Sequence, residues 1–253
     1  MLKIIYQDND LLVIDKPPYL VVDPADTVKE ETLADILEKD FGIKLFRGGL
    51  VHRLDKDTSG IMLVAKTQPV LENLQAQFKE RKIKKEYLSL VHGWIEEGGV
   101  VDASIARNPI KREKFIVAAG GPRQAVTEYE PINKFKIQSE KLKVIFEDFN
   151  KIQMRKLGKM NYNQFSLVSC KPLTGRTHQI RVHLKYIGHP IVTDETYVGR
   201  KMFRLDKRWC PRIFLHAKRI GFYHPGSGQW MELESKLPED LSKVLDLLRS
   251  LEQ

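Results

Sequence analysis

Cysteine is scarce in this sequence, which has only Cys170 and Cys210 among its 253 residues. The two lie far apart in the chain, and neither belongs to a pattern of metal ligands. A disulfide framework and a zinc knuckle are therefore both disfavoured, and we expect two ordinary intracellular thiols.

Long apolar runs are also missing. The first residues carry Asp8, Asp10 and Asp15 among apolar side chains, unlike the basic start and apolar middle of a signal peptide. No run approaches the roughly 18 apolar residues that a membrane-spanning helix needs. We therefore expect a cytoplasmic protein that has no membrane partner.

The signatures of several common enzyme chemistries are absent as well. The sequence has neither the GxSxG elbow of a serine hydrolase nor the GxxxxGKS/T loop of a nucleotide-driven enzyme. It also lacks the GxGxxG turn of dinucleotide-binding proteins and the HExxH helix of zinc proteases. We therefore expect no metal and no cofactor.

Positive charge is abundant. Lysine and arginine number 42 against 33 acidic residues, which gives a formal net charge of +9. Basic side chains gather in three stretches, at residues 79–85, 107–114 and 200–208. A solvated surface would explain each stretch alone. Three of them in one strongly basic chain favour a polyanionic partner such as RNA.

The hydrophobic pattern changes between strands and helices without a regular βαβ order. Strands are expected at residues 2–6, 11–16, 61–66, 86–94, 125–130, 143–148, 164–171 and 212–225. Helices are expected at residues 30–41, 67–82, 177–187 and from 238 onward. The pattern predicts an α+β fold: a mixed, largely antiparallel sheet with flanking helices, formed by residues 1–253 as a single domain.

One motif, HRLDKDTSG at residues 52–60, places the carboxylate of Asp55 between basic neighbours. The motif is dense in turn-forming residues and leads into an expected strand. Such a loop can present an ionised aspartate at the entrance of the strand. A simple role for Asp55 in capping or turning the chain is the alternative at this point.

A second motif, TGRTHQIRVHL at residues 174–184, enters an expected helix. The guanidinium groups of Arg176 and Arg181 have the fork geometry that suits a phosphate or a carboxylate. An arginine beside an aspartate would keep that aspartate ionised at neutral pH. His178 and His183 are five positions apart and lie on different sides of a helix, so we expect no metal pair there.

These two motifs closely resemble the signatures of the RluA-type branch of pseudouridine synthases. Four shorter segments follow the order of that family, namely DKPP, KKEYLSLVHG, GHPIVTDETY and FLHAKRIGFYHP. The matches cover roughly residues 1–130 and 164–225. The resemblance implies the pseudouridine synthase fold and an enzyme that isomerises uridine to pseudouridine in RNA without a cofactor.

The resemblance also implies roles for particular residues. Asp55 would be the nucleophile and Arg181 its ion-pair partner. Tyr87 would stack on the uracil and is the favoured base for the proton at C5. Arg53 would help to extrude the target nucleotide, and Leu215 would line the base pocket.

His52 and Arg176, which lie within the two motifs, are further candidates for contacts with RNA. The sequence departs from the family where Thr193 and Val198 replace glycines, which puts the geometry of that loop in question. Residues 134–163 are longer than the usual connection, and we interpret them as an extended hairpin or an insertion. The S4-type domain that precedes the catalytic region of many relatives is expected to be absent.

The target is expected to be RNA, with large-subunit ribosomal RNA favoured because HGWIEEGGVVDASIARNP resembles members that act on it. A tRNA uridine isomerase of the same family is the first alternative. A non-catalytic RNA-binding or ribosome-assembly factor on the same fold is the second, and a hydrolase that uses the aspartate is the third. We expect a monomer.

Overall fold

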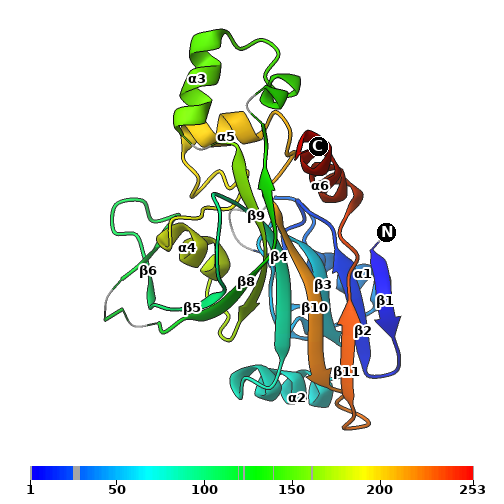
Figure 1. Ribbon diagram of the computed structural model, residues 1–253. Coiled ribbons are helices and arrows are strands. Elements are labelled where there is room, and N and C mark those ends of the chain that lie inside the picture. Colours follow the sequence, from blue (N-terminus) through cyan, green and yellow to red (C-terminus); the bar gives the residue numbers. More distant parts are fainter. Residues whose placement is uncertain are drawn as a thin grey trace. The chain divides into compact units, whose positions relative to one another are not determined.

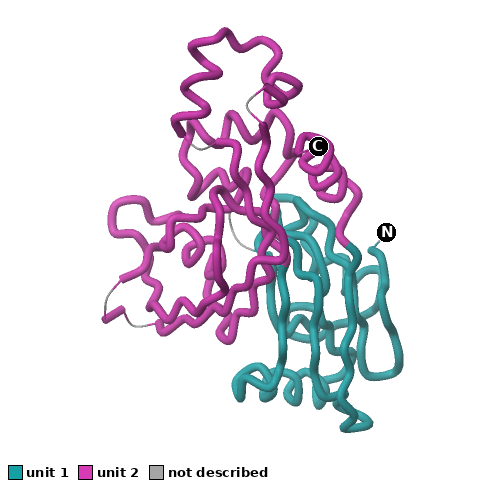
Figure 2. Tube along the Cα trace, in the orientation of Figure 1, with its two compact units in different colours: residues 1–87, 216–236 teal, residues 88–215, 237–253 magenta. Residues whose placement is uncertain are grey.

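A computed structural model describes residues 2–24, 29–118, 120–121, 123–138, 140–160 and 162–252 of the chain. The chain forms two compact units, which Figure 2 distinguishes by colour. Unit 1 comprises Met1–Tyr87 and His216–Lys236, and unit 2 comprises Leu88–Leu215 and Leu237–Gln253. Strand β4 (Lys84–His92) begins in unit 1 and continues in unit 2.

Unit 1 is built on strands that pair in the order β1-β2-β3-β10, and β11 also pairs with β10. The pairs are antiparallel except β3 with β10, which is parallel, so the sheet is mixed. Its elements, drawn in Figure 1, are β1 (Lys3–Gln7), β2 (Leu11–Lys16), α1 (Leu33–Phe41), η1 (Phe46–Gly49), β3 (Ser59–Ala65), α2 (Gln68–Lys79), β10 (Leu215–Tyr223) and β11 (Trp230–Glu234).

The core of unit 1 lies between this sheet and its helices. Every residue of β3 is buried, which agrees with the expected buried strand at 61–66. Helix α1 starts at a capping box, in which Thr32 and Asp35 each accept a hydrogen bond from the other's backbone amide. Leu37 of α1 and Leu74 of α2 belong to one apolar cluster with the residues of β2 and β3. The helices therefore hold the sheet from which the first motif emerges.

Unit 2 contains strands in the order β4-β9-β8-β5, and β8 pairs antiparallel with both β9 and β5. Strands β6 and β7 form a separate antiparallel pair. The elements are β5 (Gly99–Asp102), β6 (Ile105–Arg107), β7 (Phe115–Val117), β8 (Val126–Lys136), η2 (Lys141–Val144), α3 (Lys151–Lys159), β9 (Gln164–Pro172), α4 (Gln179–Tyr186), α5 (Arg200–Asp206) and α6 (Glu239–Glu252). The apolar stripe expected on the last helix is confirmed, since its members are all buried: Leu241, Val244, Leu245, Leu248 and Leu251.

The prediction of a strand at residues 143–148 is wrong. The 3-10 helix η2 (Lys141–Val144) occupies the start of this stretch, and the chain is anchored by the buried Leu142 within η2 and the buried Phe146 just after it. Their spacing of four positions is helical, whereas a strand would bury alternate residues. Beyond the last β8–β9 pair, Lys136 with Gln164, the segment expected as an insertion holds η2 and α3.

Gly60, at the end of the first motif, lies where β3 and β10 approach each other closely. It has φ +123, and an added Cβ would lie 2.3 Å from the Ala217 carbonyl oxygen on the neighbouring strand. We expect Gly60→Ala to lower the free energy of unfolding by about 3 kcal/mol or more, because strain and a backbone clash combine. Urea denaturation followed by circular dichroism measures this.

Gly228→Ala is the matched control, because Gly228 has φ +69 and open space around the added Cβ. Strain alone should then cost about 1–2 kcal/mol. Equal losses in the two variants would contradict the close approach of β3 and β10.

Candidate active site

The first motif forms a tight turn immediately before β3. The Thr58 amide donates a hydrogen bond to the Asp55 carbonyl at 3.1 Å, which closes the turn. Leu54 is buried and anchors the turn on one side, while Arg53 and Lys56 are exposed on the other. Asp55 is partly exposed between them. The turn therefore holds the backbone of Asp55 in place and leaves its carboxylate within reach of solvent.

Lys16, from the DKPP segment, fastens this turn to the N-terminal hairpin. Its side chain is fully buried. Nζ donates hydrogen bonds to the carbonyl oxygens of Pro17 at 2.7 Å, Leu20 at 3.0 Å and Lys56 at 3.1 Å. A buried ammonium group needs such acceptors to offset the loss of water. The residue after Asp55 is thereby tied to the end of β2.

A buried polar chain secures the start of β3. Ser59 Oγ lies 3.0 Å from His216 Nδ1, and His216 Nε2 lies 3.2 Å from the Ser235 carbonyl oxygen. A carbonyl can only accept, so in a neutral ring Nε2 carries the proton and Ser59 donates to Nδ1. Ser235 Oγ in turn donates to Asp15 at 2.8 Å. The chain of bonds links β2, β3 and β10 just behind the turn.

Tyr87 lies on β4 within unit 1 and packs against the apolar cluster. Burial raises the pKa of its phenol well above the usual value, and the negative charge of Asp55 raises it further. The two predicted catalytic groups of unit 1 are therefore close enough to interact electrostatically. Tyr87 rests as a neutral phenol.

His52 is held by protein atoms on several sides. Its Nε2 accepts a hydrogen bond from the Leu63 amide at 3.0 Å, and its ring stacks on Phe78 at 5.1 Å between centroids. Burial, and after it the positive charges of Lys85 and Arg47, lower the pKa of His52 to about 3. A neutral ring that supports β3 accounts for these contacts, and the RNA contact expected of His52 stays a prediction.

Arg53 is more than half exposed, with 59% of its side chain accessible. Its Nη1 donates to Asp23 at 3.2 Å, while Arg47 binds the same carboxylate through two hydrogen bonds of 2.7 Å. Arg47 thus satisfies most of the charge of Asp23. The guanidinium of Arg53 is therefore exposed and only weakly held, and its expected role in extruding the target nucleotide stays a prediction.

The second motif lies in unit 2, where Arg181 points inward from α4. Its Nε and Nη2 donate to the two oxygens of Asp194, each at 2.8 Å, and Nη2 also donates to Thr196 at 3.0 Å. Its guanidinium carbon lies 5.1 Å from the Tyr197 ring centroid. Bidentate pairing and stacking fix the orientation of this cation. Its predicted pairing with Asp55 stays a prediction.

The entrance to α4 differs from a simple turn because His178 is in the left-handed region, with φ 56. Its Nδ1 lies 2.9 Å from the Tyr197 hydroxyl. Arg176, just before it, is exposed and donates to the Gln124 carbonyl at 3.2 Å. Leu215, the first residue of β10, is buried. Helix α4 (Gln179–Tyr186) is therefore shorter than the helix expected at 177–187, and Arg176 lies before it.

Thr193, which stands where the family commonly has glycine, is also left-handed with φ 58. This conformation is unfavourable for a β-branched residue. Its amide donates to Asp206 at 2.8 Å and its hydroxyl to the Cys210 carbonyl at 3.2 Å. These bonds hold the strained residue, and Asp194, the partner of Arg181, follows it directly. The loop thus keeps the backbone geometry that glycine would adopt.

Two lysines that sequence reasoning did not place in the site are important to it. Lys16 belongs to the DKPP motif, and a lysine close behind the apolar run LLVI is a signal of burial with partners. Lys85 was counted in a surface cluster, yet burial lowers its pKa to about 8. It lies two positions from Tyr87 on β4, so both side chains project from the same face of the strand.

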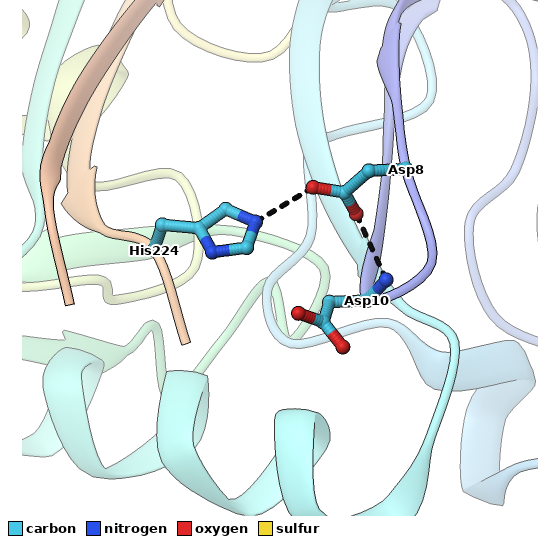
Figure 3. Close-up of side chains that lie close together, drawn as sticks. All are labelled: Asp8, Asp10 and His224. Atoms are coloured by element: carbon cyan, nitrogen blue, oxygen red, sulfur yellow. Dashed lines mark hydrogen bonds and ion pairs between the residues drawn. The ribbon is translucent and has the colours of Figure 1, made fainter. Parts of the chain in front are cut away.

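Asp8, Asp10 and His224 come close together at the end of the β1–β2 turn (Figure 3). Asp8 accepts hydrogen bonds from His224 Nε2 and the Tyr6 hydroxyl, each at 2.7 Å, and from the Asp10 and Leu11 amides at 2.8 and 2.7 Å. Burial alone would raise the pKa of Asp8, but these hydrogen bonds lower it to about 2. Both Asp8 oxygens thus already have protein donors, which accounts for the approach of the Asp8 and His224 side chains.

Comparisons with known proteins bear on this site. A family model described as "RNA pseudouridylate synthase" matches residues 10–186. The chain is 38% identical over 261 residues to "Ribosomal large subunit pseudouridine synthase D" of Nitrosomonas europaea, covering 99% of this chain and 66% of that protein. The relative with the same name in Pseudomonas aeruginosa is also 38% identical over 261 residues, covering 98% of this chain and 72% of that protein.

A solved structure, "Human RNA Pseudouridylate Synthase Domain Containing 1", aligns with a TM-score of 0.69 and 26% identity, covering 99% of this chain and 95% of that chain. The chain therefore belongs to the RNA pseudouridylate synthase family, and its mixed, mostly antiparallel sheet with flanking helices is the pseudouridine synthase fold. Within that family it is an RluA-type enzyme, as its two motifs predict. Over the described residues, no helix has the length and apolar character to cross a bilayer.

His52 makes the stability of the protein depend on pH. The unfolded histidine takes up a proton below about pH 6.5, whereas the folded one does not until about pH 3, so its contribution to stability is complete above pH 6.5 and falls as the pH drops. We expect the free energy of unfolding to fall by roughly 2 kcal/mol more in the wild type than in His52→Gln between pH 7.5 and pH 5. Urea titrations at both pH values measure this.

The glutamine keeps an acceptor for the Leu63 amide but cannot titrate. The two proteins should therefore differ little at pH 7.5. Parallel losses in both would show that His52 does not carry this part of the pH dependence.

Proposed function

We propose that this chain isomerises specific uridines to pseudouridine in large-subunit ribosomal RNA, with Asp55 as the nucleophile. The observation that carries the proposal is the turn that presents the Asp55 carboxylate beside the phenol of Tyr87, fixed from behind by Lys16. The names of the relatives in Nitrosomonas and Pseudomonas support the choice of RNA. The enzyme would then act in the cytoplasm, on RNA or on ribosomal precursors.

The reaction begins when the target nucleotide leaves its stack, which costs a few kcal/mol. Contacts between basic side chains and phosphates offset this cost, and the exposed Arg53 is suited to hold the displaced backbone. Asp55 then attacks the nucleoside, at C1′ of the ribose or at C6 of the uracil. This is covalent catalysis by a carboxylate.

In the C1′ route, a bond forms from Asp55 to C1′ while the bond from C1′ to N1 breaks, and the uracil leaves with the electron pair. The uracil turns in the site, and its C5 attacks C1′ and releases the carboxylate. The proton on C5 leaves and N1 gains a proton, so reactant and product are isomers. The chain of steps balances without a redox carrier or a nucleotide.

Arg181 provides the positive charge that the proposal pairs with Asp55. The bidentate contact with Asp194 supports this role because it fixes the direction of the guanidinium before substrate binds. The ion pair would favour the ionised and therefore nucleophilic form of Asp55.

Tyr87 would stack on the uracil and later accept the proton from C5. In the resting enzyme its raised pKa keeps the phenol protonated, partly because Asp55 is charged. In the C1′ route, Asp55 loses its charge when it forms the covalent bond, and the phenol can then give its proton to N1 of the departing uracil more easily. The phenolate that remains accepts the proton that C5 loses, so Tyr87 ends the reaction as a neutral phenol.

The first test of the proposal is release of tritium from RNA labelled at uracil C5. We expect Asp55→Asn to release at least about a thousandfold less tritium than the wild type while it still binds RNA, because the amide cannot act as the nucleophile. Asp57→Asn, an exposed carboxylate of the same turn, is the control and should remain active. Equal release by Asp55→Asn and the wild type would reject catalysis by Asp55, and no release by either would favour a non-catalytic RNA-binding factor.

Tyr87→Phe separates stacking from proton transfer. The variant keeps the ring and should bind RNA normally, but we expect C5 tritium release to slow by about a hundredfold because the phenol oxygen is gone. Tyr87→Leu, which also lacks the ring, should be slower still. A phenylalanine variant with the wild-type rate would contradict the proton-acceptor role.

A further inference from the structure

Unit 2 contains a pocket of ≈ 430 Å³ that is lined by residues of α3 and α5, and in Figure 1 α5 lies at the lower end of α3. None of the residues predicted to be catalytic lines it. Its lining includes five basic side chains: Lys156, Arg200, Lys201, Arg204 and Arg208. The pocket therefore concentrates positive charge at a place that the proposed reaction does not use.

The floor of this basic pocket is apolar. Leu157 of α3 and Leu205 of α5 are buried, and Phe149 is partly exposed at its edge. Basic side chains above an apolar floor suit a polynucleotide, whose phosphates need cations and whose sugars and bases can cover apolar surface.

The buried side of α5 is held in place by hydrogen bonds to Asp206. Asp206, at the end of α5, is fully buried and accepts hydrogen bonds from the Tyr162 hydroxyl at 2.6 Å and the Thr193 amide at 2.8 Å. Trp209 Nε1 also donates to the Tyr162 hydroxyl at 2.9 Å. Because Tyr162 closely follows α3, these bonds tie the chain around both helices to the loop that contains Thr193. The basic pocket is thus preorganised.

An aromatic pair continues this framework beside the pocket. Phe146 and Phe149 lie 4.9 Å apart between ring centroids, and the guanidinium carbon of Arg208 lies 5.3 Å from each ring. Arg208 also forms an ion pair with Asp148. Arg208 therefore has a structural role, and its charge is largely met within the protein.

The other cations of the pocket are differently placed. Lys156, Arg200 and Arg204 are exposed, and among the described residues that line the pocket none is acidic. Arg200 and Arg204 are four positions apart on α5 and share one face. Like charges held close together repel one another, and an anion that enters the pocket removes this cost.

We infer that this basic pocket is a second RNA-binding site, which grips the sugar–phosphate backbone of the substrate away from the target uridine. The inference rests on the proposed function for the identity of the substrate. The segment expected as an insertion supplies α3, one wall of the site. The site thus lets a chain segment outside the two motifs contribute to the choice of RNA.

The test compares binding of a large-subunit ribosomal RNA transcript by the wild type and by the double variant Arg200→Gln/Arg204→Gln across a range of salt concentrations. Each phosphate contact contributes about 0.7–0.9 to the slope of log affinity against log salt. We therefore expect the slope of the variant to be shallower by about 1.5 and its affinity at low salt to be about tenfold weaker. Arg200→Lys/Arg204→Lys, which keeps the charges, should retain most of the affinity.

The matched control is Lys243→Gln/Arg249→Gln on α6, which removes the same charge from exposed residues that do not line the pocket. It should leave the slope close to that of the wild type. Thermal unfolding checks that all variants fold. A slope and affinity for Arg200→Gln/Arg204→Gln that equal those of the α6 control would overturn the second site.

Tritium release separates this inference from the proposed function. If the wild type releases no tritium but the α5 variant still binds RNA with a shallower slope, the catalytic proposal fails and the binding site stands. If the wild type is active and the α5 variant binds like the control, the binding site fails and the catalytic proposal stands.

Discussion

The buried ammonium group of Lys16 is the interaction on which the proposed active site depends. It holds the carbonyl of Lys56, directly after Asp55, together with two carbonyls at the end of β2. Burying such a charge without acceptors would cost on the order of several kcal/mol, so the folded chain has to close around it. The turn that carries Asp55 is therefore fixed by folding, before any RNA binds.

The parts of the fold that the sequence could predict are those whose apolar side chains follow the period of a single helix or strand. The stripe on α6 and the continuous apolar run of β3 bury side chains at the period of their own element, and both were predicted correctly. Helix α1 was expected to start three residues early, at residue 30, because its capping box begins only at Thr32. Local chemistry thus specified where these elements lie, with errors confined to their ends.

The errors arise where tertiary contacts decide. Residues 143–148 are rich in β-branched and aromatic side chains, which suggested a strand, but Leu142 and Phe146 are buried at helical spacing. The sequence does not predict helices α3 and α5 because they are short and polar, and Leu157 is the one buried residue within α3. Asp206 explains why α5 exists where it does, and no local pattern in the sequence reveals that its carboxylate meets Tyr162 and Thr193.

The basic residues also divide into cations that are paired within the protein and cations that are exposed. This distinction changes how the net charge of +9 should be interpreted. Lys16 is buried against carbonyls, Arg181 is bound by Asp194, and Arg212 is bound by Asp240, so these cations are committed to the protein. The second motif identified Arg181 as a candidate site residue. A count of basic residues alone could not distinguish it from a cation on the surface. Only cations that are exposed and lack an acidic neighbour can release counterions when RNA binds. Arg200 and Arg204 are exposed, and no acidic residue in the described part of the chain forms an ion pair with either of them. Helix α5 is held instead through the buried carboxylate of Asp206.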